Sequence, residues 1–179
     1  MPRSITLSSP AKLNLYLKVK RKRSDGFHEI VTLFERINLC DTLSFQENSS
    51  GAIAIQCDHP HVPLGSKNLV HKVAKALQNQ YKITKGVHIK IKKRIPVAAG
   101  LAGGSSNAAT ALLALNRLWD IGLAKSDLIS LGSSLGSDVA FFLYNTSFGL
   151  GTGRGEKIRT MVCQQKLKHL LVVPRVKLY

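Results

Sequence analysis

Hydrophobic and polar residues alternate through much of the first third of the chain, which is the two-residue period of strands with one buried face. The alternation predicts strands at 5–7, 13–19, 30–39, 42–45 and 52–57. Pro10 has no N–H to give to a ladder, so we expect residues 8–10 to interrupt the first strand. The basic run 18–23 ends in the turn signal Ser24-Asp25-Gly26, and Asn48-Ser49-Ser50-Gly51 is a second turn signal. The first of these predicts a charged hairpin.

Further along the chain, apolar residues recur at the spacing of helices. This period is found at 68–81, 108–119 and 126–135. The first of these helices has Ser66 or Asn68 as a candidate N-cap. Strand patterns lie at 87–91, where Val and Ile alternate with His and Lys, and at 170–173. An apolar run lies at 139–144, and glycine alternates with other residues at 149–155.

Composition limits the class of protein. The chain has 179 residues, of which 44% are hydrophobic, enough for one domain, or for one domain and the start of another. No apolar run approaches the ~20 residues of a membrane span, and Met1-Pro2-Arg3 leads into strand sequence rather than a signal peptide. We therefore expect a cytoplasmic protein without a membrane partner. Cys40, Cys57 and Cys163 are scattered and odd in number, so we expect reduced, packed thiols rather than disulfides or a zinc site.

The formal net charge of +16 changes the picture, because it favours an anionic partner. Nucleic acid, a membrane surface and a polyanionic small molecule all fit this charge. Charge alone does not choose among them. The basic run 18–23 is either a solvated hairpin or an electrostatic attractor for polyphosphate substrates.

The loop 96–107, Pro-Val-Ala-Ala-Gly-Leu-Ala-Gly-Gly-Ser-Ser-Asn, joins a predicted strand to a predicted helix through small residues and hydroxyls. Glycine lets the backbone approach an anion, and a helix N-terminus offers free N–H groups. The loop therefore predicts a phosphate cradle, although neither a Walker loop nor a dinucleotide fingerprint fits its spacing. The alternative is an ordinary strand-to-helix turn with Ser105 or Ser106 as N-cap.

Four further side chains are candidates for binding or catalysis. Asp138 follows a helix-ending glycine and precedes an apolar run, where a general base can be positioned, although a turn or capping role is the common alternative. Lys12 and Asn14 share one phase of a strand and would present an amine and an amide from one surface, unless each is an ordinary surface residue. Phe27-His28 at a turn exit suits a nucleobase; the alternative is a core phenylalanine beside an exposed histidine.

Four segments form a set when they are taken together: Ser9-Pro10-Ala11-Lys12-Leu13-Asn14-Leu15, Asp25-Gly26-Phe27-His28, the loop 96–107, and Leu135-Gly136-Ser137-Asp138-Val139. In order and over essentially the whole chain, this set resembles the superfamily of galactokinase, homoserine kinase, mevalonate kinase and phosphomevalonate kinase. The first two segments are typical of the branch that phosphorylates the 2-hydroxyl of 4-diphosphocytidyl-2-C-methyl-D-erythritol in non-mevalonate isoprenoid biosynthesis. The resemblance implies an α+β fold, with the superfamily's two-layer, ribosomal-protein-like N-terminal domain at 1–160. At 161–179 it implies only the first strand of a C-terminal lobe.

The resemblance also implies residue roles. Asp138 would accept the hydroxyl proton with Lys12 assisting, Asn14 and His28 would hold the cytidine-diphosphate-linked substrate, and Phe27 would lie beside the cytosine. ATP is implied as the phosphoryl donor, with Mg²⁺. The implied ATP-binding residues are Asn68, Lys93, Pro96, Val97, Ala98, Ala99, Gly100, Leu101, Ala102, Gly103, Gly104, Ser105 and Ser106.

Two departures from the superfamily's pattern leave alternatives open. Ala99 and Ala102 stand where the superfamily frequently has glycine, so we expect both to adopt negative φ. In the superfamily a second, C-terminal lobe closes the site, and this sequence ends where that lobe would begin. One alternative is therefore a chain that has the binding and catalytic residues but no activity. Another small-molecule kinase of the superfamily and a basic nucleic-acid-binding module are the others.

Overall fold

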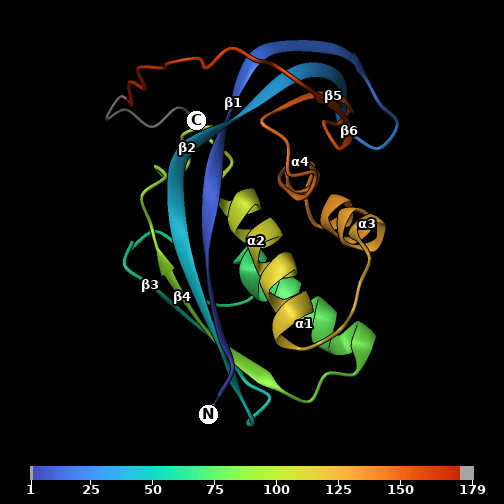
Figure 1. The fold of residues 1–179 in the computed structure, drawn as a ribbon. Coiled ribbons are helices and arrows are strands. Elements are labelled where there is room, and N and C mark those ends of the chain that lie inside the picture. Colours follow the sequence, from blue (N-terminus) through green and yellow to red (C-terminus); the bar gives the residue numbers. More distant parts are fainter. Residues whose placement is uncertain (1, 174–179) are drawn as a thin grey trace.

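A single sheet and a layer of helices make up the computed structural model of the chain, which describes residues 2–173. Six strands form the sheet, and the helices lie together on one of its faces (Figure 1). The two-layer α+β fold predicted from the resemblance is confirmed. No helix of residues 2–173 combines the length and the apolar character that a bilayer crossing requires.

The long hairpin of β1 (Ser4–Lys22) and β2 (His28–Asn48) arches across the whole molecule (Figure 1). The predicted charged hairpin is confirmed, and β2 joins the two strands expected at 30–39 and 42–45. The predicted interruption at Pro10 is wrong, because β1 runs through it and Pro10 pairs with Cys40. A register shift between Pro10 and Lys12 accommodates the missing N–H, as is usual for proline in an edge strand.

The other four strands build on β2. These are β3 (Ile53–Cys57), β4 (Gly86–Lys92), β5 (Phe148–Gly153) and β6 (Lys157–Met161). The sheet order is β3-β4-β2-β5-β6, with β1 also paired to β2. The second half of β2 pairs with β4 and its first half with β5, and only β3 and β4 are parallel. Their connection carries α1, as a parallel crossover requires.

Three of the four helices in the described part of the chain follow the predicted spacing: α1 (Leu69–Tyr81), α2 (Gly103–Leu118) and α3 (Lys125–Leu135). The apolar run at 139–144 forms the short helix α4 (Val139–Leu143), which is buried throughout. The core lies between the sheet and α1, α2 and α4, where aliphatic residues of β2 and β4 meet the small and branched side chains of α2. This packing fixes the loop that precedes α2.

The predicted strand at 170–173 and the predicted packing of Cys163 are wrong. Residues 170–173 form no strand, because no neighbouring strand pairs with them and Leu170 is 91% exposed; residues 174–179 lie outside the described part. Cys40 and Cys57 are half-buried, but Cys163 is exposed because it follows β6 where nothing packs over it. Burial raises the pKa of the Cys40 thiol.

Asn68 is the N-cap of α1 and was one of the two candidates that the sequence offered. Asn68 Oδ1 accepts the Val70 N–H at 2.9 Å, and Asn68 Nδ2 donates to the Pro63 carbonyl at 2.7 Å. We expect Asn68→Ala to lower the free energy of unfolding by about 1 kcal/mol, the usual cost of losing a cap. Asn68→Asp keeps the accepting oxygen but loses the donor to Pro63, so it should recover part of that loss in urea denaturation. Equal losses in the two variants would contradict the capping role.

Candidate active site

The β-bulge of β1 brings Lys12 to the glycine-rich loop. At the register shift, the Lys12 N–H leaves the ladder and donates to the Leu101 carbonyl at 3.1 Å. Ala11 is fully buried beside Leu101 and Ile95, in a small apolar cluster that holds strand and loop together. The side chain of Lys12 is thereby carried to the cavity beside the loop.

Lys12 and Asp138 form the central charged pair, with Lys12 Nζ 3.6 Å from Asp138 Oδ2. Lys12 is only 5% exposed, so the alternative of an ordinary surface lysine is wrong. Its ammonium donates to Asn14 Oδ1 and lies 5.3 Å from the centre of the Phe34 ring. Asn14 is exposed and donates in turn to Thr32 Oγ1 at 2.7 Å. These contacts aim the ammonium at the carboxylate.

Asp138 lies in the turn between α3 and α4, immediately before the buried residues of α4. Its side chain makes no capping hydrogen bond, so the capping alternative is wrong. The carboxylate is one-third exposed and faces the same cavity as Lys12. It therefore keeps an oxygen available to a ligand.

That cavity has a volume of about 650 Å³ and is bounded by β1, the start of α1, the glycine-rich loop and Asp138. Of the predicted site residues, most of the loop and its neighbours line it: Lys12, Asn14, Asn68, Lys93, Pro96, Val97, Ala98, Ala99, Gly100, Leu101, Ala102, Gly103, Gly104 and Asp138. Residues far apart in the sequence thus meet at one concave surface. Such a cavity is the usual form of a small-molecule site.

The loop has an unusual backbone. Ala98, Gly100 and Ala102 have φ of 60°, 73° and 54°, so positive φ occurs at every second residue. This kind of alternation turns successive N–H groups toward one side and builds anion-binding concavities. Ala102 is also the N-cap of α2 and provides no side-chain hydrogen bond to the helix. The expectation of negative φ at Ala102 is wrong, because the strand-to-helix turn requires the left-handed conformation at this point.

The alternative in which Ser105 or Ser106 is the N-cap of α2 is wrong. Both are inside the first turns of α2, not at its N-cap, and neither lines the cavity. Ser106 is fully buried, and its hydroxyl lies 2.8 Å from the hydroxyl of Ser9 on β1. The hydroxyl of Ser106 therefore joins α2 to β1 and is not directed at a ligand.

A buried carboxylate, Asp41 of β2, organises the base of the loop. Its Oδ1 accepts the N–H groups of Arg94 and Ile95 at 2.8 and 2.9 Å. Its Oδ2 accepts the Lys93 ammonium and, at 2.9 Å, the Asn107 amide. Lys93 thus lines the cavity with its charge already paired. Neither Asp41 nor Asn107 was a predicted site residue.

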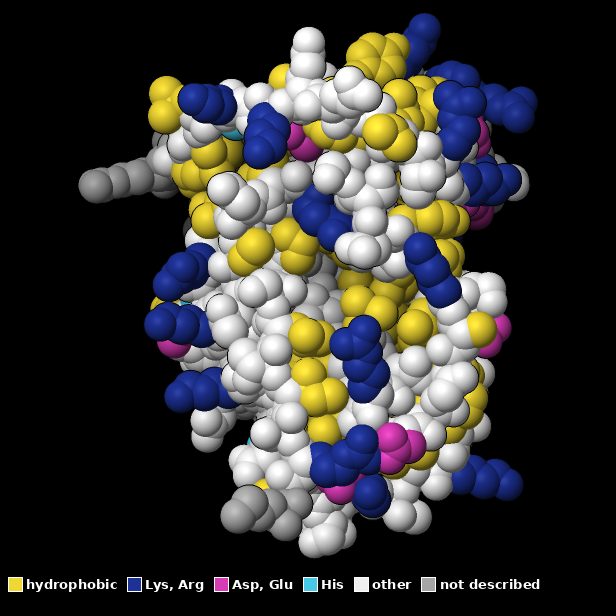
Figure 2. Space-filling model, viewed as in Figure 1, with side chains coloured by type: hydrophobic (Ala, Val, Ile, Leu, Met, Phe, Trp, Pro, Cys, Tyr) yellow, Lys and Arg dark blue, Asp and Glu magenta, His cyan; other side chains and the backbone are white. Residues whose placement is uncertain are grey.

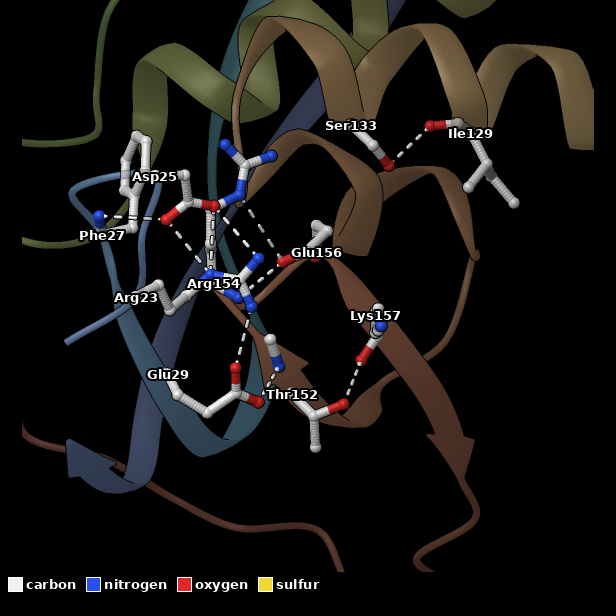
Figure 3. Close-up of polar contacts among 11 residues, drawn as sticks. Arg23, Asp25, Phe27, Glu29, Ile129, Ser133, Thr152, Arg154, Glu156 and Lys157 are labelled. Atoms are coloured by element: carbon white, nitrogen blue, oxygen red, sulfur yellow. Dashed lines mark hydrogen bonds and ion pairs between the residues drawn. The ribbon is translucent and has the colours of Figure 1, made fainter. Parts of the chain in front are cut away.

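Phe27 and His28 are not brought to the cavity. Both are exposed at the tip of the hairpin, so the core alternative for Phe27 is wrong. The Arg154 guanidinium lies 4.8 Å from the centre of the Phe27 ring. Arg23 donates to Glu29 at 2.9 Å, and Glu29 accepts the Gly153 N–H from the end of β5 (Figure 3). The hydrogen bond from Arg23 holds the pKa of Glu29 below its usual range, and these contacts fix the tip against β5.

The described residues do not by themselves form a magnesium site. No group of three His, Cys, Asp or Glu in residues 2–173 is arranged to hold a metal ion. Among the described residues that line the cavity, Asp138 is the one acid, and Lys12 lies beside it. In nucleotide sites magnesium is held mainly by phosphate oxygens and water, with one or two protein carboxylates, and the one carboxylate of residues 2–173 that lines this cavity is already paired with Lys12.

Backbone strain in the loop leads to a stability prediction. Left-handed φ destabilises a non-glycine residue by roughly 1–2 kcal/mol, and replacement by glycine removes this strain. Glycine also gives the unfolded chain more conformational freedom, which lowers the stability by about 0.4–1 kcal/mol. We therefore expect Ala102→Gly to raise the free energy of unfolding by about 0.5–1 kcal/mol. The matched control is Ala111→Gly in the middle of α2, which should lower it by at least about 1 kcal/mol. Urea denaturation of both variants measures the two signs, and a loss for Ala102→Gly would contradict the strain.

Comparison with known proteins gives the class first. The family profile described as "GHMP kinases N terminal domain" matches residues 68–146, which contain α1, β4, the loop, α2, α3 and α4. Together with the two-layer fold and the loop before α2, this match places residues 68–146 in the class of GHMP-kinase N-terminal domains.

Within that class, the similarity is to one kind of kinase. The protein of Shouchella clausii named 4-diphosphocytidyl-2-C-methyl-D-erythritol kinase is 42% identical over 173 residues, which are 97% of this chain and 58% of the relative. The Prochlorococcus marinus (strain MIT 9215) protein of the same name is 47% identical over 154 residues, 86% of this chain and 49% of the relative. A crystal structure described as 4-(cytidine 5'-diphospho)-2C-methyl-D-erythritol kinase is 38% identical with a TM-score of 0.75, covering 88% of this chain and 55% of that one.

The chain is therefore a homologue of these kinases, as the four sequence segments predicted. It spans about half the length of the curated relatives it matches.

Proposed function

We propose that the chain forms the nucleotide-binding and base-bearing part of an ATP-dependent kinase. Its substrate would be 4-diphosphocytidyl-2-C-methyl-D-erythritol, phosphorylated on the 2-hydroxyl. The observation that carries the proposal is the 3.6 Å Lys12–Asp138 pair, which faces the glycine-rich loop across one cavity. Residues 1–160 would form this unit, since they contain every residue that the proposal uses, and residues 161–179 would lead out of it.

Asp138 acts as the general base in this proposal. Its carboxylate accepts the proton of the 2-hydroxyl as the oxygen attacks the γ-phosphorus of ATP, and the bond from that phosphorus to the β,γ-bridging oxygen breaks. Lys12 holds the carboxylate in place and offsets negative charge on the transferred group. Phosphoryl transfer depends mainly on position and charge, so one base and one ammonium are a sufficient protein contribution beside a phosphate cradle.

The loop is the proposed phosphate cradle. The alternating positive φ at Ala98, Gly100 and Ala102 and the uncapped N-terminus of α2 support it, because both present N–H groups to an anion. A Cβ at Gly100 or Gly104 would meet no atom within 4 Å, so no other part of the described chain packs against the loop at these positions. Asn68 would lie near the adenine. Lys93 would act by shaping the loop, since Asp41 already pairs its charge.

The residues proposed to bind the cytidine-diphosphate-linked substrate are Asn14, Phe27 and His28. Asn14 touches the Lys12 ammonium and so lies next to the reacting centre. Phe27 and His28, at the hairpin tip, would bind the cytosine by stacking and by a hydrogen bond to the base edge. Lys and Arg side chains gather over this end of the molecule (Figure 2), and their field would attract both anionic substrates.

Nucleotide binding and specificity test the proposal. Titration of the chain with a non-hydrolysable ATP analogue should give saturable binding, with amide NMR shifts concentrated at 96–104. The chain, alone and joined in frame to the unmatched part of the Shouchella clausii relative, is then assayed with labelled ATP. Mevalonate and homoserine are the competing acceptors. Absence of nucleotide binding would overturn the proposal, and transfer to another acceptor would reassign the substrate.

The net charge of +16 keeps a nucleic-acid-binding role as a second candidate. A basic binding module should bind RNA with a steep salt dependence, since each neutralised phosphate releases counterions. RNA binding that ATP does not compete with, together with no nucleotide binding at the loop, would favour this candidate.

A further inference from the structure

A second cavity, of about 480 Å³, lies between the first half of β1, β2, α2 and α4, and none of its residues lines the Lys12–Asp138 cavity. Its walls are largely apolar. Three cations, Arg36, Arg117 and Lys125, also line it, and none of the described residues around it is acidic. A cavity with apolar walls and unopposed positive charge favours an anionic ligand with an apolar part.

Arg36 is the strongest feature of this second cavity. Its guanidinium donates to Asn145 Oδ1 at 3.1 Å and weakly to the Phe142 carbonyl at 3.4 Å. Its Nε is buried and has no hydrogen-bond partner, and no carboxylate of residues 2–173 lies within 4.0 Å of the side chain. Burial lowers the pKa of the Arg36 guanidinium, but arginine stays charged in proteins.

The two lysines with buried side chains beside the active site, Lys12 and Lys93, both have a carboxylate partner. Lys12 is paired with Asp138, and Lys93 with Asp41. A charge removed from water without such a partner is costly. Neither Arg117 nor Lys125, the other cations of the second cavity, has a carboxylate partner in residues 2–173, and Lys125 donates only to the Tyr144 carbonyl, at 3.0 Å. Arg117 and Lys125 are exposed to water, so Arg36 is the cation of this cavity whose partly buried charge has no carboxylate partner in residues 2–173.

We propose that this second cavity binds a small amphipathic anion, a phosphate or carboxylate carried on a short alkyl chain. The head group would accept from the terminal nitrogens of the Arg36 guanidinium, since Nε itself is buried, with Lys125 and Arg117 adding charge attraction. The alkyl chain would lie along Leu113, Leu128 and Phe142, which line the same cavity. Separate attraction for each half is what distinguishes this ligand from a simple anion.

The probe is hexyl phosphate, compared with inorganic phosphate and with hexanol. We expect saturable binding of hexyl phosphate to the chain by isothermal titration, at least tenfold tighter than either half-ligand. Methyl NMR shifts should concentrate at Leu113, Leu128 and Leu143. Hexyl carboxylate (heptanoate) in a further arm distinguishes a phosphate-specific site from a general anion site. Equal affinity for inorganic phosphate and hexyl phosphate would overturn the proposal, and so would binding at the loop 96–104 alone.

Arg36→Met removes the charge and keeps an apolar side chain of similar reach. It should weaken hexyl phosphate binding at least tenfold, whereas Arg159→Met, which removes the same charge from exposed β6, should not. The double variant Arg117→Met/Lys125→Met changes only exposed side chains, so it decides the question if Arg36→Met does not fold. Unchanged affinity in the double variant and in any folded Arg36→Met would overturn the proposal.

Discussion

Asp138→Asn lowers the rate of phosphoryl transfer by about 10²–10⁴-fold, the usual contribution of a positioned general base, and leaves nucleotide affinity unchanged. Asparagine keeps the shape of the side chain but cannot accept the hydroxyl proton. Nucleotide affinity is retained because the proposed phosphate contacts come from the loop backbone and α2, not from the carboxylate. Labelled-ATP transfer by the chain joined to the unmatched part of the Shouchella clausii relative measures the rate, and titration of the chain alone measures the affinity.

Asp127→Asn is the matched control for this prediction. Asp127 lies in the first turn of α3, where it accepts the Ala124 N–H at 3.2 Å and does not line the active-site cavity. The same chemical change there should leave the rate within about twofold, since helix-terminal charges contribute little beyond about 1 kcal/mol of stability. Transfer by Asp138→Asn at the rate of the unchanged protein would remove Asp138 as the base.

The sequence predicted those parts of the fold that depend on local periodicity. The helices at 68–81 and 126–135 and the hairpin turn at 24–26 are confirmed because caps, turn residues and apolar spacing act within a few residues. The interruption predicted at Pro10 was wrong because the effect of a proline depends on the position of its strand in the sheet. In an edge strand with a bulge, the missing N–H is harmless, and that position is decided by β2, far away in the chain.

The sequence likewise indicated candidate residues of the site, but not how the fold arranges them. Lys12 and Asp138 could be proposed from their motifs, but 126 positions separate them, and only the fold brings Nζ within 3.6 Å of the carboxylate. Local sequence could not give the φ values of Ala98 and Ala102, because the path between β4 and α2 imposes them against the preference of alanine. Phe27 and His28 lie at the hairpin tip, outside the cavity, and their role stays a prediction.

The position of Asp41 in the alternating pattern of β2 could have indicated its structural role, although it was not a predicted site residue. It shares the buried phase of β2 with Leu43 and Phe45, and an acid in that phase needs several hydrogen-bond partners. Its partners lie 52 to 66 positions away, at the base of the loop and in α2. The alternating pattern therefore indicates that the Asp41 carboxylate needs hydrogen-bond donors, but it does not identify the residues that provide them.

Asp41→Ala is expected to lower the free energy of unfolding by about 3–5 kcal/mol, because it leaves the buried Lys93 ammonium without its counter-ion. It also removes acceptors for the Arg94 and Ile95 N–H groups and for Asn107. A loss of this size is a large part of the roughly 5–15 kcal/mol that stabilises a typical domain. The midpoint of urea denaturation measures it.

Asp58→Ala separates charge burial from the loss of a loop hydrogen bond. Asp58 also accepts an N–H from the base of the loop, that of Lys93 at 2.8 Å, but it is exposed, so about 0.5–1.5 kcal/mol is expected. The ion pair itself is isolated by the double variant Asp41→Asn/Lys93→Met. If the unpaired ammonium is the main cost, the double variant is more stable than Asp41→Asn alone, with a coupling free energy of about 1–3 kcal/mol. Additive losses would instead assign the effect of Asp41 to its backbone contacts, and the loop would then be held by the carboxylate's hydrogen bonds rather than by its charge.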